Sequence, residues 1–536
     1  MEGRIRWRHG FLLLLLLGPL DGALAGTVLT IITPGPQSHL FGMRKVTIEM
    51  AARGHKVAFL AAEHDAERLS QAGIPIITYS VRPWSGQSAT GGIHVAGPQS
   101  LMTTVAKYQP IITNSCDSLL ANDTVLAQIQ ALGAELIFGT SFFPCTGTLA
   151  YRLDVPIVNF LPAAPIEPYF TSLWRGSNRR LFSSNPLSYV PQMELDFTTQ
   201  YLSFPQRLQN FVKFWHVHLL DYLYVRPGVL ATYRKYGIDL DAPRERRRIV
   251  MTLCIADFAI EWLRSLPPNF KLIGPVLPEP ACPLPGDLEE FMANAGERGV
   301  LYVAMGTVAT LGLKERQAMA AAFAQLPARV LWRLSKSEVP DENALAALTL
   351  GNNTKVVTWA PQNDVLGHPR TRAFLSHCGV NSLYEAAYHG VPVVALPFFG
   401  DQPGNAGQAV ARGFAVRVRH SDIGTAAFPV ALAQVLGNGS YAAAARKMSV
   451  KLRARKRTPV QEAVDWVEHV LATGGEAYLR TPDDDLPLVV RLSLDVWAAC
   501  LGAAAVLVYT TFLLARLVFA KFGAALFGSG PKAKAA

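Results

Sequence analysis

Residues 359–405 gather polar and aromatic side chains of the kinds that bind nucleotides and sugars. Within them, an apolar run typical of a buried strand, residues 373–376, stops at His377-Cys378-Gly379, and helical spacing follows from Ser382. A strand that passes through a small-residue turn into a helix presents unpaired backbone N–H groups and the positive end of the helix dipole. The pattern therefore predicts a site for an anionic group, although a simple helix cap has the same pattern.

The residues around this turn supply the remaining groups that a nucleotide-sugar needs. They include an aromatic face for a base, a carboxylate for a ribose, polar donors for phosphates and an Asp-Gln pair for sugar hydroxyls. In chain order the candidates are Trp359, Gln362, His377, Gly379, Asn381, Ser382, Glu385, Asp401 and Gln402. This combination within one short span favours a nucleotide-sugar site over a plain helix cap.

The segments WAPQNDVLGHP, AFLSHCGVNSLYEAAYHGVP and FFGDQPGN closely resemble the signature of the UDP-glycosyltransferases, above all the membrane-bound animal-type UDP-glucuronosyltransferases. The resemblance implies an α/β fold of two Rossmann-like domains that face each other across a cleft, the arrangement called GT-B. The first domain would bind the acceptor and the second the UDP-sugar, which is a co-substrate. No metal ion or other cofactor is expected.

The resemblance also implies a role for each residue of the signature. Trp359 would stack on uracil, Gln362 would contact the uridine and Glu385 would hold the ribose hydroxyls. His377, Asn381 and Ser382, with Gly379, would hold the diphosphate, Asp401 and Gln402 the transferred sugar, and Gly306 and Thr307 would add to the phosphate site.

His39 follows the first apolar β-branched run, residues 27–33, at the point where an open parallel sheet exposes ligands. A lone histidine is more often structural, but the resemblance implies that His39 is the general base that takes the acceptor's proton. In the family an aspartate just before a Phe-Pro-Cys-like segment orients this histidine and stabilises its protonated form. Here Phe143-Pro144-Cys145 places Thr140 at that position, and a neutral hydroxyl cannot offset an imidazolium charge.

Two functions from different classes therefore stay open. One is an inverting glycosyltransferase that moves a hexosyl or glucuronosyl group to a hydroxyl, or another nucleophile, of a small lipophilic acceptor. The other is a UDP-sugar-binding membrane protein with weak or no transferase activity, because Thr140 replaces the family's aspartate. The sequence specifies neither the donor sugar nor the acceptor, and a homo-oligomer is compatible with it.

The two ends of the chain predict its compartment. A basic segment, an apolar run and Ala23-Leu24-Ala25 have the pattern of a cleaved signal peptide, and residues 496–515 are long and apolar enough to span a membrane. Acidic residues precede this span, and the charged residues that follow it are all basic. This asymmetry predicts a cytosolic C-terminus and lumenal catalytic domains. The ending Lys532-Ala-Lys-Ala-Ala536 fits a dilysine retrieval tail, so the endoplasmic reticulum membrane is expected, with glycosylation acceptors at Asn122, Asn352 and Asn438.

The predicted organisation follows from these signals and from a proline-dense linker. The expected parts are a signal peptide (1–25), an N-terminal acceptor-binding domain (26–273), the linker (274–287), a C-terminal UDP-sugar-binding domain (288–472), a juxtamembrane segment (473–495), a single-pass transmembrane helix (496–515) and a basic cytosolic tail (516–536). The last helix of the second domain is expected to pack back across the first. Residues 162–236 are interpreted as acceptor-side helices that also rest on the membrane, with ordinary core packing as the alternative.

Composition excludes several other functions. The net charge is +10, but the basic clusters 244–248 and 446–457 contain no interleaved aromatic residues, so nucleic-acid binding is not expected. The six cysteines contain no CxxC pair, which argues against a zinc site, and free buried cysteines are the default expectation. Asp239-Leu-Asp241 superficially fits a metal-binding DxD, but a loop pair of acids is the preferred interpretation.

Overall fold

The computed structural model describes residues 25–34, 37–81, 95–96, 101–140, 142–163, 165, 190–192, 195–238, 248–306, 309–474, 477–479, 488–491 and 493–527. Residues 1–24 of the predicted signal peptide, Thr307, the acid pair at 239 and 241 and the retrieval tail lie outside the described residues. The chain divides into two compact units, Met1–Arg480 and Thr481–Ala536. The catalytic candidates all belong to the first unit, and the apolar C-terminal helix belongs to the second.

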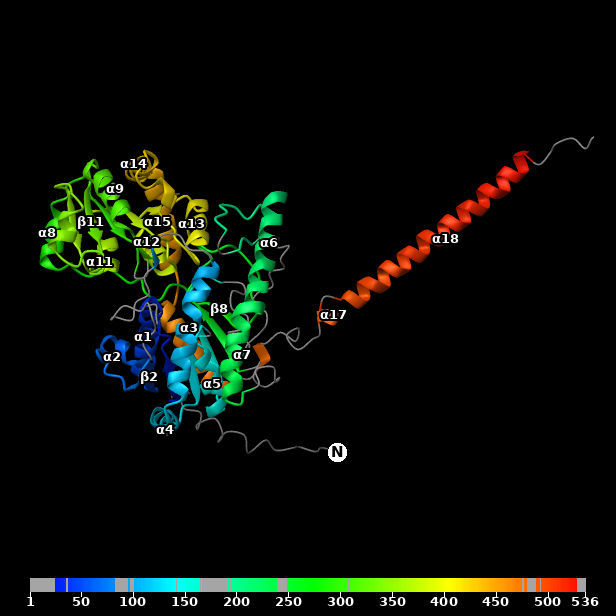
Figure 1. Cartoon of the computed structure of the whole chain (residues 1–536), viewed down its shortest axis with the longest axis horizontal. Helices are drawn as coiled ribbons and strands as arrows, with labels where there is room; N and C mark the ends of the chain where they lie inside the picture. Colours follow the sequence, from blue (N-terminus) through cyan, green and yellow to red (C-terminus); the bar gives the residue numbers. More distant parts are fainter. Residues whose placement is uncertain are drawn as a thin grey trace, which may run out of the picture. The chain divides into compact units, whose positions relative to one another are not determined.

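Seven parallel strands form the first sheet, in the order β3-β2-β1-β5-β6-β7-β8 (Figure 1). Their bounds are β1 (Thr27–Ile31), β2 (Lys56–Ala62), β3 (Ile76–Tyr79), β5 (Leu136–Gly139), β6 (Ile157–Leu161), β7 (Ile249–Cys254) and β8 (Phe270–Leu272). After β1 the chain adds strands on one side, and from β5 onward it adds them on the other. The topological switch point therefore lies between β1 and β5, where doubly wound sheets bind ligands outside the carboxyl ends of the strands.

The second sheet repeats this plan with six parallel strands, in the order β12-β11-β9-β13-β14-β15. Its strands are β9 (Val300–Ala304), β11 (Arg329–Arg333), β12 (Thr354–Val357), β13 (Thr371–Ser376), β14 (Val393–Ala395) and β15 (Ala415–Arg417). Here the switch point lies between β9 and β13. A small parallel pair, β4 (Val95–Ala96) and β10 (Ala309–Thr310), joins a segment of the first half to one of the second.

The strands form because their residues are nearly continuous apolar runs, which suit parallel sheets covered on both faces. All four residues of β5 and all five residues of both β6 and β9 are buried, and helices flank the sheets. The helices of the first half are α1 (Gln37–Ala52), α2 (Glu63–Ser70), α3 (Leu101–Leu120), α4 (Asp123–Leu132), α5 (Pro144–Leu153), α6 (Phe204–Leu220), the π-helix η1 (Asp221–Val225) and α7 (Arg226–Lys235).

The helices of the second half follow the same alternation with strands. They are α8 (Gly286–Ala293), α9 (Leu313–Ala324), α10 (Glu342–Ala346), α11 (Gln362–Gly367), α12 (Val380–His389), α13 (Gln402–Ala411), the short η3 (His420–Asp422), α14 (Ala427–Gly437), α15 (Gly439–Arg453) and α16 (Pro459–Thr473). The sequence predicts α9, α12, α14 and α16 of this half and α1, α4 and α6 of the first half. It does not predict α3, which contains Pro110 in its interior. The basic cluster 446–457 lies mainly on α15.

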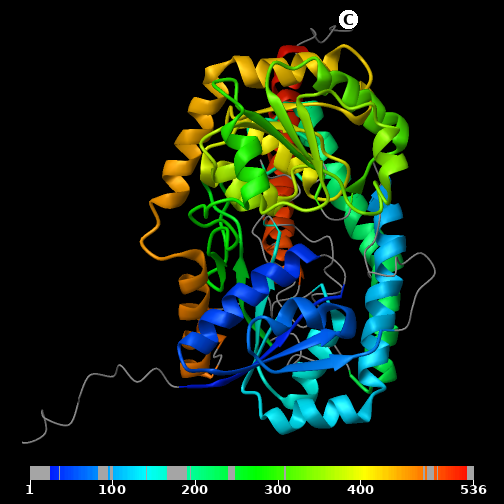
Figure 2. The same ribbon diagram turned by 90° about the vertical axis from the view of Figure 1, so that its left-hand side faces the viewer.

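Helix α16 returns to the first half and packs against α1, which confirms the expected crossing (Figure 2). The helix starts with a capping box between Thr458 and Gln461. Arg53, just after α1, pairs with Asp465 at 2.7 Å and with Glu468 at 3.1 Å. These partly buried ion pairs, reinforced by apolar packing, connect the end of the second half to the start of the chain.

Helix α6 has one buried and one exposed apolar face. Phe214, Val217 and Leu220 are buried, so the alternative of core packing holds for the inner face. The outer face exposes large hydrophobic side chains at helical spacing, which are Phe204, Leu208, Val212, Trp215 and Leu219. The outer face is therefore not packed in a core, so that alternative is wrong for this face. The predicted contact of this region with the membrane stays a prediction.

The second unit contains the helices α17 (Leu488–Arg491) and α18 (Leu494–Phe527). Residues Leu494–Phe522 of α18 are long and apolar enough to cross a membrane, with a mean hydropathy of 2.0. This candidate span contains the predicted segment 496–515.

Candidate active site

The predicted phosphate turn forms at the carboxyl end of β13. Cys378 adopts a left-handed backbone with φ of 62°, and its N–H donates to Ser376 Oγ at 3.1 Å. Gly379 is the N-cap of α12, so the N-terminus of this helix opens directly beside the second switch point. The sequence-predicted strand, turn and helix start are therefore confirmed as local structure.

His377 lies between two glycines from neighbouring strands. A Cβ on Gly379 would lie 2.5 Å from His377 Nε2, and a Cβ on Gly306 would lie 2.4 Å from the same atom. Gly306 follows β9 and also has a positive φ of 74°, which favours glycine. Any larger residue at either position would displace the imidazole, so the two glycines determine where this ring can stand.

The imidazole of His377 is neutral at physiological pH. Burial, together with the positive charge of Arg333, lowers its pKa to about 4. Its Nδ1 atom is buried and has no hydrogen-bond partner among the described residues. A neutral imidazole still donates one N–H, which is the interaction that a phosphate oxygen accepts.

Arg333 is a candidate that sequence reasoning missed. It is the last residue of β11, and its guanidinium donates to the carbonyl oxygen of Gly306. Its fixed positive charge therefore stands beside the predicted diphosphate site. Arg333 could have been found from its position at the carboxyl end of a predicted strand. That this strand lies next to β9, however, is known only from the order of strands in the sheet.

Hydrogen bonds connect Asp401 to the predicted phosphate turn. Asn405 Nδ2 donates to Asp401 Oδ2 at 2.8 Å and to the carbonyl of Cys378 at 2.9 Å. The N–H of Val380 also bonds to the Asp401 carboxylate. Burial raises the pKa of Asp401, and these hydrogen bonds oppose that shift. Asn405 is thus a second missed residue, although it lies inside the FFGDQPGN segment.

Gln402, the first residue of α13, has its side-chain carbonyl occupied. Gln402 Oε1 accepts hydrogen bonds from the backbone N–H groups of Phe398, at 2.8 Å, and Phe399, at 3.3 Å. The side chain is buried. These bonds fix the loop that leads from β14 to Asp401, so Gln402 positions this loop whatever else it binds.

A polar cluster connects α11 to α12. Gln362 Nε2 donates to Ser382 Oγ at 3.0 Å and to Glu385 Oε2 at 2.5 Å. Burial raises the pKa of Glu385 to about 7, against the opposing effect of the Gln362 bond and the charge of Lys45. The structure therefore brings Gln362 into contact with two candidates that lie 20 and 23 residues further along the chain.

Trp359 and Asn381 lie at the margins of this cluster. The Trp359 side chain is 68% exposed just before α11, so one face of the indole is accessible for stacking. Asn381 is half-buried on the first turn of α12. All of the predicted donor residues within the described part of the chain belong to β9, β13, α11, α12, α13 or the loops beside them.

His39 stands at the other switch point. It lies in the first turn of α1, after β1, and its ring stacks on Phe142 with a centroid distance of 5.9 Å. Burial lowers the pKa of His39 to about 4, and Nδ1 is buried with no hydrogen-bond partner among the described residues. His39 is therefore neutral at pH 7, as a general base has to be.

Thr140 follows β5, the neighbour of β1, and is fully buried. Its Oγ accepts the N–H of Phe142 at 3.2 Å, and its carbonyl accepts the hydroxyl of Thr146 at 2.9 Å. The hydroxyl thus caps the local turn. Asp154, the next acid along the chain, is exposed and pairs with Arg248 at 3.1 Å, so it lies at the surface.

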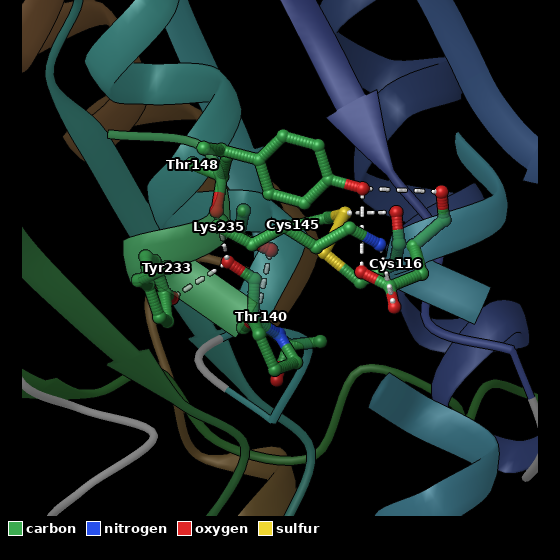
Figure 3. Close-up of a disulfide and its surroundings, with 10 residues drawn as sticks. Cys116, Thr140, Cys145, Thr148, Tyr233 and Lys235 are labelled. Atoms are coloured by element: carbon green, nitrogen blue, oxygen red, sulfur yellow. Dashed lines mark hydrogen bonds and ion pairs between the residues drawn. A yellow bond between two sulfur atoms is a disulfide. The ribbon is translucent and has the colours of Figure 1, made fainter. Parts of the chain in front are cut away.

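A disulfide supports the turn that contains Thr140. Cys116 on α3 bonds to Cys145 at the start of α5, and Tyr233 donates to the carbonyl of Pro144 at 2.6 Å (Figure 3). The expectation of free cysteines is wrong for this pair. The sequence did not predict α3, so it could not show that Cys116 on α3 lies next to Cys145 on α5. Cys254, Cys282, Cys378 and Cys500 are free.

Two doubly wound sheets, with a diphosphate-type helix start at one switch point and a histidine at the other, define a nucleotide-sugar glycosyltransferase of the GT-B class. Solved structures with the same fold include the glycosyltransferase of kitacinnamycin, with a TM-score of 0.58 and 17% identity over 83% of this chain and 99% of that one. Another is UDP-glucose: anthocyanidin 3-O-glucosyltransferase in complex with UDP, with a TM-score of 0.57 and 19% identity over 84% and 99% of the two chains.

The chain belongs to the UDP-glucoronosyl and UDP-glucosyl transferase family, whose model matches residues 26–525. It is 30% identical to human UDP-glucuronosyltransferase 2B28 over 94% of this chain and 95% of the relative. It is 29% identical to mouse UDP-glucuronosyltransferase 2A1 over 94% and 96% of the two chains. It is therefore a UDP-glycosyltransferase of the glucuronosyltransferase type, which transfers sugar from a UDP-sugar.

Proposed function

We propose that the protein transfers a hexosyl or glucuronosyl group from a UDP-sugar to a hydroxyl, or another nucleophile, of a small lipophilic acceptor, with inversion at the anomeric carbon. The observation that carries this proposal is the paired placement of His39 and the His377 turn. Each follows a strand at the switch point of its sheet, where doubly wound folds bind their ligands. Acceptor activation and donor binding are thereby assigned to different halves.

In the proposed reaction, His39 accepts the proton of the acceptor hydroxyl through Nε2, since Nδ1 is the buried nitrogen. The acceptor oxygen attacks the anomeric carbon in line, and the bond from that carbon to the β-phosphate oxygen breaks. UDP leaves with the electron pair. The N-terminus of α12, the N–H of His377 and the charge of Arg333 stabilise the negative charge that develops on the diphosphate.

For the donor, we propose that Trp359 stacks on uracil and that Gln362 and Glu385 bind the uridine and ribose. Asp401 and Gln402 would contact the transferred sugar. The hydrogen bonds among Gln362, Ser382 and Glu385 support this assignment, because a site whose polar groups are already ordered loses less entropy on binding. No metal ion is part of the proposal.

A second candidate function is a UDP-sugar-binding membrane protein with weak or no transferase activity. The hydroxyl of Thr140 favours it, because this group carries no charge and is engaged by the N–H of Phe142. The donor site would be unaffected, so such a protein would bind UDP and release it unchanged.

One assay separates the two candidates. Full-length protein in detergent is incubated with UDP-glucuronate, UDP-glucose, UDP-galactose or UDP-xylose and a panel of phenols, and glycoside products are identified by mass spectrometry. Turnover with one of these donors is expected. Measurable UDP binding without turnover would instead support the binding protein.

His39→Ala tests the catalytic assignment. Loss of a positioned general base typically lowers the rate by about 10² to 10⁴, and UDP binding should be retained. His64→Ala, which removes a half-buried histidine on α2 that pairs with Asp65, is the matched control and should keep turnover. Full activity of His39→Ala would contradict the role of His39 as the base.

We also propose a type I protein of the endoplasmic reticulum membrane with both Rossmann-like halves in the lumen. The disulfide supports this proposal, because such bonds persist in oxidising compartments. Protease treatment of intact microsomes is expected to spare the catalytic halves, and endoglycosidase H is expected to shift the mass of the chain. Digestion of these halves without detergent would contradict the orientation.

A further inference from the structure

We propose that the acceptor is an acidic hydroxyl, a phenol or a carboxylic acid, and that aliphatic alcohols are poor substrates. This inference rests on the proposed function, since it presupposes that His39 is the base. The observation behind it is that His39 stacks on an apolar side chain, Phe142, whereas a base that deprotonates a weakly acidic alcohol needs an anionic partner to stabilise its protonated form. Thr140, at the end of the neighbouring strand β5, is neutral and supplies no such anion.

Among the described residues, the aromatic side chain that packs against the His39 ring is apolar. The ring stacks on Phe142 at an interplanar angle of 30°, and the buried Nδ1 contacts no hydrogen-bond acceptor among the described residues. Burial is the cause of the lowered pKa of His39, and no charged side chain in the described part of the chain adds to it. An imidazolium formed here would therefore be a buried cation without a counter-charge.

Thr140 cannot supply the missing charge, and its turn is held in place. Its hydroxyl accepts the N–H of Phe142, the same residue that stacks on His39. The hydroxyl of Thr146 donates to the carbonyl of Thr140. The adjoining helix start is crosslinked to Cys116 through Cys145, as Figure 3 shows. These supports fix the turn in which Thr140 accepts the N–H of Phe142, the stacking partner of His39.

The chemistry of the step then selects the acceptor by its acidity. The acceptor O–H bond breaks, its proton goes to His39 Nε2, its oxygen bonds to the anomeric carbon, and UDP leaves with the electron pair of the broken C–O bond. An aliphatic hydroxyl is about as weakly acidic as water, so its attack requires nearly complete proton transfer to the His39 ring. A phenol has a pKa of about 10 and needs far less help, and a carboxylic acid with a pKa of about 4 is already ionised at pH 7.

The first test uses the full-length wild-type protein and needs no variant. We compare kcat/KM for shape-matched phenols and cyclohexanols that carry the same para substituent, and for a series of phenols of graded acidity. The phenol of each pair should be favoured by at least about 100-fold, the lower end of the effect of a general base, and log kcat/KM should rise as the phenol pKa falls. Alcohols within about threefold of their phenols would overturn this inference while leaving the transferase proposal intact.

Thr140→Asp tests the assignment of the preference to this position. A carboxylate there should raise the alcohol-to-phenol ratio of kcat/KM at least about tenfold, by stabilising the imidazolium. Thr425→Asp makes the same substitution at an exposed loop threonine that caps the start of α14, so it serves as the charge-matched control and should leave the ratio unchanged.

UDP binding and thermal unfolding establish that each variant is folded. A folded Thr140→Asp protein with the wild-type ratio would overturn the role given to Thr140. The absence of turnover with every acceptor would overturn the transferase proposal itself, together with this inference. A wild-type preference for phenols that Thr140→Asp reduces would support both.

Discussion

Replacing Glu261 with glutamine is expected to stabilise the folded protein at neutral and alkaline pH. Glu261 follows β7 in the first half, is only 1% exposed, and accepts a hydrogen bond from Gln408 Nε2 on α13 at 2.9 Å. The guanidinium of Arg412 donates to the backbone carbonyl of Glu261 at 2.8 Å. These contacts hold α13, and therefore the loop with Asp401, against the first half of the molecule.

The magnitude follows from the pKa of this carboxyl group. Burial raises the pKa of Glu261 to about 7 from its ordinary 4.5, and nearby Asp401 adds to the increase. The folded state therefore holds the proton more tightly than the unfolded chain does. The stabilisation that this protonated carboxyl group contributes is complete below about pH 4.5 and is lost as the pH rises through 7. The difference between the folded and unfolded pKa values corresponds to a loss of about 3 kcal/mol at pH 8.

Glutamine has the same shape as the protonated carboxyl group, can accept the Gln408 bond and does not ionise. At about 2.1 cal/mol/K per residue over roughly 450 residues that unfold together, 3 kcal/mol corresponds to an increase of about 3 °C in Tm. Unfolding of the full-length protein is followed by tryptophan fluorescence from pH 5 to 8.5. The Tm advantage of Glu261→Gln over the wild type should grow as the pH rises from 5 to about 7 and should then level off.

Glu297→Gln, at an exposed side chain, is the matched control and should follow the wild type at every pH. Parallel Tm curves for the wild type and Glu261→Gln across this range would refute the reasoning. They would mean that the carboxylate is ionised in the folded state without penalty, and that burial between β7 and α13 does not determine its protonation.

Two further predictions concern the donor turn and the disulfide. Gly379→Ala should raise the Kd for UDP at least about tenfold by isothermal titration calorimetry, because its Cβ would lie 2.5 Å from His377 Nε2. Gly437→Ala, where nothing lies within 4 Å of the added Cβ, should bind UDP as the wild type does. Replacing Cys116 and Cys145 together with serine should lower the free energy of unfolding by about 3–4 kcal/mol in denaturant titrations, since the bond closes a loop of 29 residues. Unchanged UDP affinity in Gly379→Ala, or unchanged stability without the disulfide, would contradict these two arguments.

The donor turn could be predicted because its parts are contiguous in the sequence. The apolar run before His377 and the helical spacing after Ser382 report local structure directly, and the structure has β13 and α12 at those places. The helix α3 could not be predicted in the same way. Pro110 in its interior contradicts local helix propensity, and packing against α5 and α7 overrides that propensity.

By itself, the sequence determined the alternation of buried strands and helices, the family signature and the absence of an acid at position 140. Only the tertiary structure decided which distant residues meet. It placed the Gly306 backbone against the His377 ring, Phe142 against His39, and Glu261 on Gln408, 147 residues further along the chain. The physical reason is that periodicity reports which side of an element is buried, whereas the order of strands in a sheet determines which strand ends become neighbours.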